Sequence, residues 1–569
     1  MEERIWHQHY SAGIPVSIDY EELTVPDFLR ASARERPDAP ALAYFNRELT
    51  YRELDDHVSR FGRALYDLGV RPGDRVAVHL PNLPQTVIAY QAALAIGAQV
   101  VLTNPLYTAH ELEHQWTDAE IKVAVTADFI YDQTIRPARA KLPPEHYVVA
   151  SIPDYMCFPL TWLAPLKLRK SNPPTIAKVQ YGDGVHSFQN LLADSEPDAP
   201  RPQIDLDDIA VLQYTGGTTG RSKGAELTHR NLSVNVQQCE RVLISGAGDP
   251  APEDEERVMM CCLPLFHVFG MTVCMNLALR TGAKLVLLPN PRDLKALVGA
   301  LEAHRVTLFP GVPALFNAIN HFRGIESRDL SHLRVCVSGS APIADDVLHR
   351  FEELTGSRII EGFGLSETSP VTHVNPIHGM RKIGSIGIPA PDTDARIVDP
   401  EDGTAALGTG EIGELLLKGP QVMRGYWKQP EQTAGALKDG WFHTGDLASM
   451  DEDGFFRIEG RMKDMINCNG MKVYPDEVDN VLMSHPKILE SATIGVPHAR
   501  RIETVKSFIV LKPGETLGEG EIREYCSREL ARYKVPARIE FLDELPKSTV
   551  MKVLRRELRE RELSKRDEA

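Results

Sequence analysis

The sequence predicts an α/β protein, in which a large N-terminal domain of βαβ-type sheets is followed by a small α+β C-terminal domain. Three observations lead to this fold class. From about 25 to 398, short β-rich runs alternate with helical stretches, which is typical of βαβ units and largely parallel sheets. Between 396 and 460 the chain changes to short strands separated by Gly, Pro and Asp turns, which indicates a β-rich subdomain. The remainder, 461–569, has the length of one further domain.

The expected elements follow from the apolar runs. Buried strands are expected at 75–82, 122–128, 284–290 and 333–340, and helices at 51–70 and 343–356. IAVLQY (209–214) is a further expected strand, and a helix is expected to start near Thr228. The C-terminal domain is expected to take its elements from 475–486, 491–497, 505–514 and 521–530. Ligands of such folds gather in the loops at the carboxyl ends of the strands.

Composition bounds the class of protein. The chain has 569 residues, 43% of them hydrophobic and 25% charged, which describes a multidomain globular protein. The net charge of −16 argues against a nucleic-acid binder. None of the eight cysteines form a C-x-x-C pair, so we expect buried thiols in a reducing compartment. The N-terminus lacks the apolar core of a signal peptide, so we expect a cytoplasmic protein. The uncharged stretch 258–279 approaches the length of a membrane span, but it contains Pro and Gly, so we expect it to form a buried strand, loop and helix.

A loop of Thr, Ser and Gly between 215 and 224 has the residue types of a phosphate-binding loop. Glycines let backbone N–H groups approach an anion, and hydroxyls add donors. The spacing differs from the common P-loop, because Lys223 lies between Ser222 and Gly224. We expect the loop to lie between the strand at 209–214 and the helix near Thr228, where a phosphate would be held.

Four further stretches accompany this loop: EGFGLSETSP (361–370), WFHTGDLASMDEDGFF (441–456), GRMKDMINCNGMKVYPDEVD (460–479) and LPKSTVMKVLRREL (545–558). In this order and spacing, the five motifs resemble those of the adenylate-forming enzymes, which include acyl-CoA synthetases, luciferases and peptide-synthetase adenylation domains. The resemblance covers essentially the whole chain. Within that superfamily, 103–119, 263–272 and 308–319 are most similar to the bacterial long-chain fatty acyl-CoA ligases.

The resemblance implies a nucleotide site for ATP. The loop expected to grip its β- and γ-phosphates comprises Thr215, Gly216, Gly217, Thr218, Thr219, Gly220 and Lys223. The adenine pocket would be formed by Ser340, Ala341, Pro342, Glu361, Gly362 and Phe363, whose ring lies against the base. Ser366 would contact the α-phosphate and Glu367 would bind Mg²⁺. Asp446 would accept the ribose hydroxyls, and Arg461 would be a second nucleotide contact.

The resemblance also implies a mobile C-terminal domain. An adenylation domain would span 1–460, and the domain 461–569 would rotate about a hinge near 461–464, with Lys463 as the hinge residue. One orientation would place Lys552 beside the α-phosphate for adenylation, and the other would place the loop with Gly470 beside the CoA thiol. Met551 stands where the family usually has Gly, and a positive φ there would strain the chain and misplace Lys552.

Two features bear on the acyl group. Gly364 stands where a bulky residue closes the acyl pocket of short-chain relatives, so a glycine here favours a long acyl chain. The other candidates for the pocket are Phe309, Gly311, Val312 and His267, for which packing in the protein core is the alternative. The apolar stretch 154–170 ends in Lys167, Arg169 and Lys170, and it is suited to the inner face of a membrane, where fatty acid partitions. A buried helix pair or a homodimer contact is the alternative.

The expected activity is that of an ATP- and Mg²⁺-dependent long-chain fatty acid–CoA ligase, which forms acyl-AMP and pyrophosphate and then acyl-CoA and AMP. Three alternatives stay open: an acyl-AMP ligase that transfers to a carrier protein, a medium-chain or aryl-CoA ligase, and a fatty-acid or nucleotide binding protein without turnover, which Met551 would favour.

Overall fold

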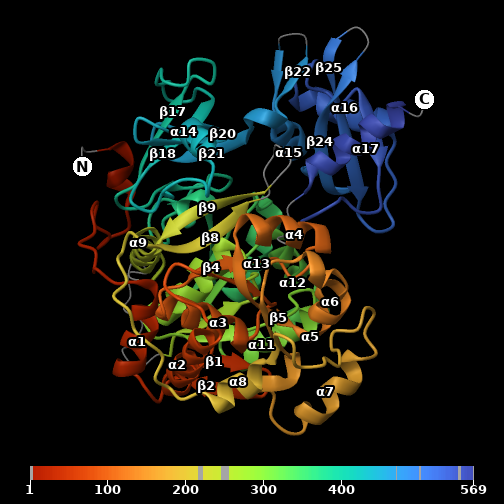
Figure 1. Cartoon of the computed structure of the whole chain (residues 1–569). Coiled ribbons are helices and arrows are strands. Elements are labelled where there is room, and N and C mark those ends of the chain that lie inside the picture. The colour runs from red at the N-terminus through yellow and green to blue at the C-terminus, as the bar shows by residue number, and fades with distance from the viewer. Residues whose placement is uncertain are drawn as a thin grey trace. The chain divides into compact units, whose positions relative to one another are not determined.

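Two largely parallel β-sheets form the frame of the first of two compact units in the computed structural model of the chain (Figure 1). The structure describes residues 4–215, 222–244, 256–468, 471–498, 501–548 and 553–567. The first unit comprises Met1–Asp394 and Lys418–Leu437, and the second comprises Ala395–Leu417 and Lys438–Ala569. The β-rich segment thus groups with the C-terminal part, whereas the sequence assigned it to the N-terminal domain.

The larger sheet of the first unit has nine strands, which are parallel in its centre and antiparallel at both edges. Their order is β16 (Ile388–Pro389), β15 (Val371–Val374), β14 (Arg358–Gly364), β13 (Val335–Ser338), β12 (Leu308–Gly311), β10 (Val258–Cys261), β11 (Lys284–Leu287), β1 (Pro40–Tyr44) and β2 (Arg47–Thr50).

The second sheet has seven strands, of which only the last pair is antiparallel. Their order is β7 (Val185–Ser187), β6 (His146–Ala150), β5 (Ile121–Ala127), β3 (Arg75–His79), β4 (Gln99–Leu102), β8 (Ile209–Thr215) and β9 (Lys223–Thr228).

The first unit also contains helices, most of which pack on these sheets. They are α1 (Val25–Glu35), α2 (Tyr51–Asp67), α3 (Pro84–Ala95), α4 (Ala109–Asp118), α5 (Asp128–Ile130), α6 (Arg136–Ala138), α7 (Leu160–Leu168), α8 (Phe188–Asp194), α9 (His229–Cys239), α10 (Leu277–Thr281), α11 (Leu294–Ala303), α12 (Pro313–Asn320), α13 (Asp345–Thr355) and α14 (Pro430–Ala436). The sequence sets local boundaries: Thr50 and Thr228 each accept the backbone N–H three residues on and so cap α2 and α9. All twelve residues of α3 are buried, as expected of a helix that is apolar on every side.

The aromatic core of the nine-stranded sheet lies under α12 and α13. Phe309 of β12 contacts the ring of Phe316, with centroids 5.2 Å apart, and Phe316 in turn contacts Phe351 at 5.0 Å. All three rings are fully buried. Edge-to-face pairs of this kind hold a core in one arrangement, so this end of the sheet is a rigid support for the loops that follow β12 and β13.

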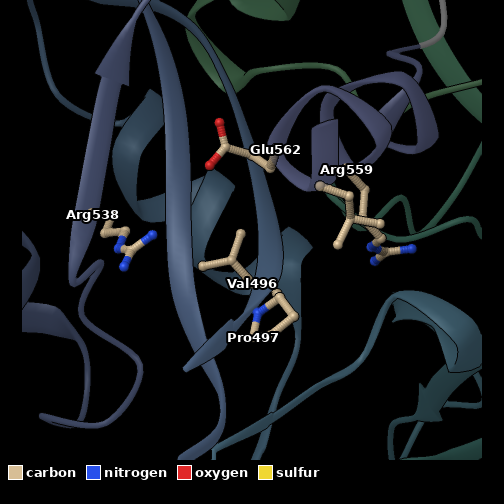
Figure 2. A pocket seen from close by; sticks show the side chains of 7 residues that line it. Val496, Pro497, Arg538, Arg559 and Glu562 are labelled. Carbon is tan, nitrogen blue, oxygen red and sulfur yellow. The ribbon is translucent and has the colours of Figure 1, made fainter. Parts of the chain in front are cut away.

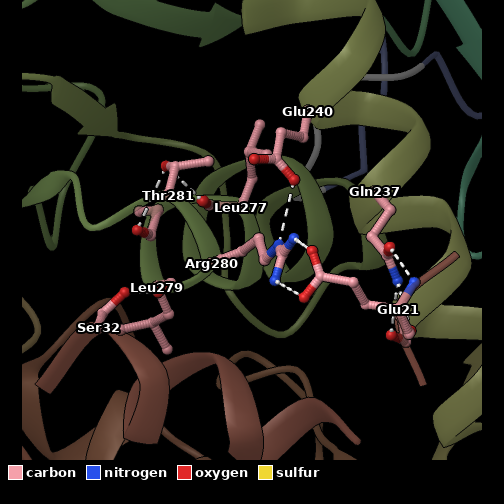
Figure 3. Close-up of polar contacts among 10 residues, drawn as sticks. Glu21, Ser32, Gln237, Glu240, Leu277, Leu279, Arg280 and Thr281 are labelled. Atoms are coloured by element: carbon pink, nitrogen blue, oxygen red, sulfur yellow. Dashed lines mark hydrogen bonds and ion pairs between the residues drawn. The ribbon is translucent and has the colours of Figure 1, made fainter. Parts of the chain in front are cut away.

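An ion-pair network fixes the N-terminal segment to the same unit (Figure 3). Arg280 pairs with Glu21 and, through Nε, with Glu240 at 3.1 Å. The Gln237 amide bonds the backbone N–H and C=O of Glu21 at 2.9 and 3.1 Å. The segment before α1 is therefore joined to α9 and α10.

The second unit contains a β-rich part and the C-terminal elements. The first consists of β17 (Asp394–Val398), β18 (Gly413–Lys418), β19 (Leu437–Lys438), β20 (Trp441–Met450) and β21 (Phe456–Arg461). The second consists of β22 (Ile466–Cys468), β23 (Met471–Val473), α15 (Pro475–Met483), β24 (Ile488–His498), β25 (Arg501–Leu511), α16 (Glu519–Glu529), β26 (Arg538–Phe541) and α17 (Arg555–Asp567). A small pocket in this part is lined by Val496 and Pro497 of β24, Arg538 of β26, and Arg559 and Glu562 of α17 (Figure 2).

The strands predicted at 75–82, 122–128, 284–290 and 333–340 and the helices predicted at 51–70 and 343–356 are confirmed, and each ends one to three residues before the end of its predicted range. Seven of the eight cysteines are buried free thiols, and only Cys157 is exposed. Residues 258–279 form β10, a short loop and a π-helical turn (Gly270–Asn276) that leads into α10. Within the described residues, no helix has the length and apolarity to cross a membrane.

Candidate functional site

Three predicted motifs meet at the carboxyl edge of the nine-stranded sheet. In the strand register, Gly311 lies beside Ser338, and Ser338 lies beside Glu361. The N–H of Gly339 also donates to the carbonyl of Gly311 at 3.2 Å. Ligands of parallel sheets bind at this edge, so the strand order brings together the residues predicted to form the adenine and acyl pockets.

The loop after β13 is shaped by close contacts. Ser340 has a φ of +72°, a left-handed conformation that costs a non-glycine residue energy. A Cβ at Gly339 would lie 2.9 Å from the ring of Phe269, so a side chain there would require this ring to shift. His267, on the loop after β10, precedes this ring by two residues and is half-buried. Ser340, Ala341 and Pro342 are exposed, which leaves this edge open to a ligand.

Glu361 is a buried carboxyl group at this edge. Its Oε2 accepts the N–H of Gly384 at 2.8 Å, and its carbonyl accepts the N–H of Asn375 at 2.9 Å. Burial raises the pKa of Glu361 to about 7, although the N–H donors of Gly384 and Ile343 act in the opposite direction. A carboxyl that titrates near neutral pH in a pocket is a recurrent property of functional sites.

Phe363 is backed by a buried histidine. The ring of Phe363 is half-buried and lies 6.1 Å from that of His373 on the paired strand β15, in an edge-to-face arrangement. Burial lowers the pKa of His373 to about 3, so the imidazole is neutral. The rigid support behind Phe363 suits a ring that stacks on a base.

Glu367 is oriented by a tyrosine that sequence reasoning missed. It follows Ser366 in the short 3₁₀ helix Ser366–Thr368, and its Oε1 accepts the hydroxyl of Tyr426 at 2.9 Å. The Nζ of Lys223 lies 5.0 Å from the centre of the same Tyr426 ring. Tyr426 therefore connects the predicted phosphate-loop cation to the predicted Mg²⁺ ligand.

The phosphate loop joins two antiparallel strands, which corrects the expected strand–loop–helix arrangement. Thr215 at the end of β8 pairs with Lys223 at the start of β9. The helix α9 begins only after β9, so its first residue is six residues beyond Lys223. Gly216, Gly217, Thr218, Thr219 and Gly220 lie outside the described residues.

The far side of β9 is paired with the segment around Tyr426. Its N–H and C=O groups bond residues 424–427, as in Trp427 N–H to the Gly224 carbonyl at 2.8 Å. Arg424 also forms an ion pair with Glu226 at 2.8 Å. The aromatic pair in RGYW (424–427), which has no role in the predicted motifs, lies in this segment. The pairing holds the base of the loop from both sides.

In the second unit, Asp446 and Arg461 are adjacent. They are opposite each other in the β20–β21 register, and Arg461 Nε lies 2.6 Å from Asp446 Oδ1. Asp446 is buried, whereas Arg461 is half-buried. A buried carboxylate that is ionised beside an arginine can accept hydroxyl hydrogen bonds, as the predicted ribose contact requires.

A second buried carboxylate shapes the HTGD turn before Asp446. Oε1 of Glu414 accepts the N–H of Gly445 at 3.1 Å, and Oε2 lies 3.0 Å from Nδ1 of His443. Thr444 donates to the carbonyl of Leu415 at 2.7 Å. Sequence reasoning missed Glu414, because an isolated Glu in a strand gives no signal of its partner.

The remaining predicted residues of the second unit are placed only in part. Lys463 is exposed in the 3₁₀ helix Met462–Asp464, which follows β21 directly. Gly470, Met551 and Lys552 lie outside the described residues. The hinge role of Lys463 and the division at 460/461 stay predictions.

The acyl-pocket residues have structural roles of their own. Phe309 and Gly311 face the aromatic core, where a Cβ at Gly311 would lie 3.1 Å from the Phe316 ring, and Val312 is buried. A Cβ at Gly364 would lie 2.1 Å from the carbonyl oxygen of Pro370. The close backbone approach therefore explains this glycine without reference to chain length, which weakens the sequence argument for an open pocket.

The stretch 154–170 begins with the buried Tyr155 and Met156 and continues into the exposed helix α7. No residue of α7 is buried, and Phe158 and Trp162 are 79% and 80% exposed. Leu163 and Leu166 add to the same exposed apolar surface. The alternative of a buried helix pair is wrong, because α7 does not pack its apolar residues into the described core.

Comparisons with known proteins agree with the motifs. The AMP-binding enzyme family matches residues 29–427, and the AMP-binding enzyme C-terminal domain matches 477–552. The chain is 41% identical over 562 residues to a long-chain-fatty-acid–CoA ligase of Bacillus subtilis, covering 98% of each chain. It is 35% identical over 531 residues to a feruloyl-CoA synthase of an Amycolatopsis species, covering 93% of this chain and 97% of the relative.

Solved structures show the same fold. The crystal structure of ATP-bound MatB from Rhodopseudomonas palustris superposes with a TM-score of 0.82 at 30% identity, over 95% of this chain and 99% of that one. The first family match covers the sheet edge with Glu361, whereas the strands with Asp446 lie between the two matched ranges. The chain is therefore a member of the AMP-binding enzyme family, the adenylate-forming group that its five motifs resemble.

Proposed function

We propose that the protein is an AMP-forming long-chain fatty acid–CoA ligase. A carboxylate oxygen of the fatty acid attacks the α-phosphorus of ATP, and the bond to the β-phosphate oxygen breaks, which gives acyl-AMP and pyrophosphate. The CoA thiol then loses its proton and attacks the acyl carbon, and AMP leaves. The full-length similarity to a long-chain-fatty-acid–CoA ligase supports the substrate class.

The observation that carries this proposal is the convergence at the carboxyl edge of β13 and β14. There, the Ser340 loop, the buried Glu361 and the backed ring of Phe363 lie side by side. An open edge with an aromatic face and hydrogen-bonding groups suits adenine. In this proposal Ser366 contacts the α-phosphate, and Thr215, Lys223 and the intervening loop hold the leaving pyrophosphate.

The proposed ribose contact is Asp446, which accepts the ribose hydroxyls and forms an ion pair with Arg461. Lys552 stabilises charge at the α-phosphate during adenylation, and Gly470 lies in the loop that faces CoA during thioester formation. Rotation about Lys463 alternates the two arrangements.

The donor set is suited to Mg²⁺. The described residues contain no cluster of three or more acidic, His or Cys side chains that would cage a metal. Mg²⁺ in nucleotide enzymes commonly takes one or two carboxylates together with phosphate oxygens, and Glu367, fixed by Tyr426, offers one such carboxylate. The ion would neutralise phosphate charge when ATP binds.

An aryl acid is the second candidate substrate. The feruloyl-CoA synthase relative favours it, and Gly364 no longer argues for a long chain. His267 and Val312 remain the candidates for the acyl channel.

The exposed surface of α7 is proposed to contact anionic lipid. Its apolar residues Phe158, Trp162 and Leu166 adjoin Lys167, Arg169 and Lys170, all exposed, in a chain whose net charge is −16. A helix with aromatic and basic side chains binds at a bilayer interface, where fatty acid is concentrated. Changing the three basic residues to Gln should reduce co-sedimentation with anionic vesicles, whereas Arg528→Gln together with Arg556→Gln, on exposed helix positions elsewhere, should not. Equal loss in both variants would contradict a role for α7.

The activity is tested by measuring AMP and pyrophosphate release with a panel of acids from acetate to oleate and ferulate, with and without CoA. CoA-dependent AMP formation that is highest with long chains is the expected result. A maximum with ferulate would favour the aryl ligase, and pyrophosphate exchange that CoA does not affect would favour a carrier-protein acceptor. No turnover with any acid would overturn the proposal.

A further inference from the structure

Described residues before and after Lys552 are joined to each other and to the C-terminal elements. The backbone of Lys547 pairs with that of Val553, which directly follows Lys552. The side chain of Lys547 forms an ion pair with Glu490 of β24. The anchored backbone therefore reaches to within one residue of the lysine.

On the other side, Arg555 begins α17 and lies between two carboxylates of α15. Its Nη2 lies 2.6 Å from Oδ2 of Asp479 and also pairs with Asp476. Only 19% of the Arg555 side chain and 4% of the Asp479 side chain are exposed. Asp479 also accepts the backbone N–H of Thr493 at 3.0 Å and its hydroxyl at 2.7 Å. The arginine thus joins α17 to α15 through a carboxylate that β24 holds in place.

The neighbouring arginine has no such contacts. Arg556 is 57% exposed and pairs with Glu560, one turn further along α17, at 3.0 Å. An exposed pair at this spacing contributes little to stability or position. The two adjacent arginines therefore differ in burial and partners while they share charge and helix.

We propose that Arg555 is a positioning residue for Lys552. Its ion pairs with Asp476 and Asp479 fix the chain three residues beyond the lysine and so set where the ammonium group lies during adenylation. The inference rests on the proposed function, in which Lys552 serves adenylation and is not used in thioester formation. Because the rate of an electrostatically assisted step falls steeply when the assisting charge moves by about 1 Å, loss of the anchor should affect one half-reaction selectively.

The test measures the two half-reactions separately in the full-length protein. Adenylation is followed by ATP–pyrophosphate exchange with fatty acid, and thioester formation by release of AMP from synthetic acyl-AMP and CoA. Arg555→Gln should slow exchange by about 100-fold and leave thioester formation within about threefold of the unchanged protein. Arg555→Lys should restore part of the exchange, since one ammonium group keeps the charge but cannot span both carboxylates. Arg556→Gln is the matched control and should change neither half-reaction.

Lys552→Ala separates failure of this inference from failure of the proposed function. If Lys552→Ala does not impair exchange, the role of Lys552 in the proposed function is wrong. If it does and Arg555→Gln behaves like Arg556→Gln, or slows both half-reactions equally, only the positioning role is wrong. Adding Arg555→Gln to Lys552→Ala should slow exchange no further, because the anchor acts through the lysine. Should Arg555→Gln fail to fold in a thermal melt, Asp476→Asn, at the more exposed of the two carboxylates, gives the same comparison.

Discussion

The hydroxyl of Tyr426 donates a hydrogen bond to the carboxylate of Glu367 at 2.9 Å, while its ring lies 5.0 Å from the ammonium group of Lys223. One side chain thus contacts both the predicted Mg²⁺ ligand, Glu367, which is 59 positions away in the sequence, and the predicted phosphate-binding Lys223, which is about 200 positions away. It can act on them separately, because the hydroxyl serves the carboxylate and the ring serves the cation.

Tyr426→Phe is expected to lower kcat/KM for ATP and to raise the Mg²⁺ concentration required for half-maximal rate. The change removes the bond to Glu367 but keeps the ring, and a hydrogen bond to a charged group contributes about 1.5–3 kcal/mol, which corresponds to about 10- to 100-fold. Steady-state kinetics over a range of Mg²⁺ would measure this. Tyr426→Leu should cost more, because it also removes the ring beside Lys223; equal losses in the two variants would argue against a separate role of the ring.

Glu414→Ala is expected to destabilise the HTGD turn. Glu414 is buried and is the acceptor for Gly445 N–H and for His443, so alanine would leave both donors without their acceptor. The free energy of unfolding should fall by about 2–4 kcal/mol, and KM for ATP should rise because Asp446 follows this turn. Urea denaturation and ATP titration would measure the two effects. Glu401→Ala is the control, since Glu401 is 83% exposed in its pair with Lys472, and it should change neither quantity.

Glu361→Gln is expected to alter how stability depends on pH. The pKa of Glu361 is raised from 4.5 to about 7, so the folded protein holds this proton more tightly than the unfolded chain. The free energy of unfolding therefore falls as pH rises from about 4.5 to about 7, by up to about 3 kcal/mol, and this loss is complete above pH 7. Gln does not titrate, so the variant should gain stability relative to the unchanged protein between pH 5 and pH 8.

Thermal or urea unfolding at pH 5 and at pH 8, without nucleotide, measures the difference in the free energy of unfolding between Glu361→Gln and the unchanged protein. Glu353→Gln, at an exposed position of α13, should show the same pH dependence as the unchanged protein. If the stability of Glu361→Gln also showed the same pH dependence as the unchanged protein, the carboxyl of Glu361 would be ionised in the folded protein at pH 5, which would contradict the prediction.

The sequence predicted the sheets well, because strands buried on both faces appear as continuous apolar runs such as LRVCVSG. It did not predict β9. Its sequence, KGAELT, contains few apolar residues. It pairs on one side with β8 and on the other with a segment that includes Arg424, which is 198 residues from Glu226 of β9. Local patterns carry no information on such distant pairing. For that reason the loop was assigned to a strand–loop–helix unit.

The same limit applies to the site. Motif residues such as Phe363 and Asp446 were predicted because the resemblance names their positions. Tyr426 and Glu414 act only through contacts with other motif residues, Glu367 and Gly445. Gly364 shows a related limit of the sequence. The absence of a side chain was attributed to the ligand, but the atom that excludes a side chain is the Pro370 carbonyl of the neighbouring chain segment.

Gly364→Ala tests that reading. Because a Cβ at Gly364 would lie 2.1 Å from the Pro370 oxygen, the backbone of β14 or of the turn before β15 has to move, and Phe363 and Ser366 move with it. We expect activity to fall by a similar factor for short and long acids, together with weaker ATP binding. Gly299→Ala, on α11, is the matched control: no atom lies within 4 Å of a Cβ at this position, so the variant should retain most activity. Loss of activity with long acids alone in Gly364→Ala would show instead that the new methyl group obstructs the acyl channel, and would restore the original argument for a pocket that this glycine keeps open.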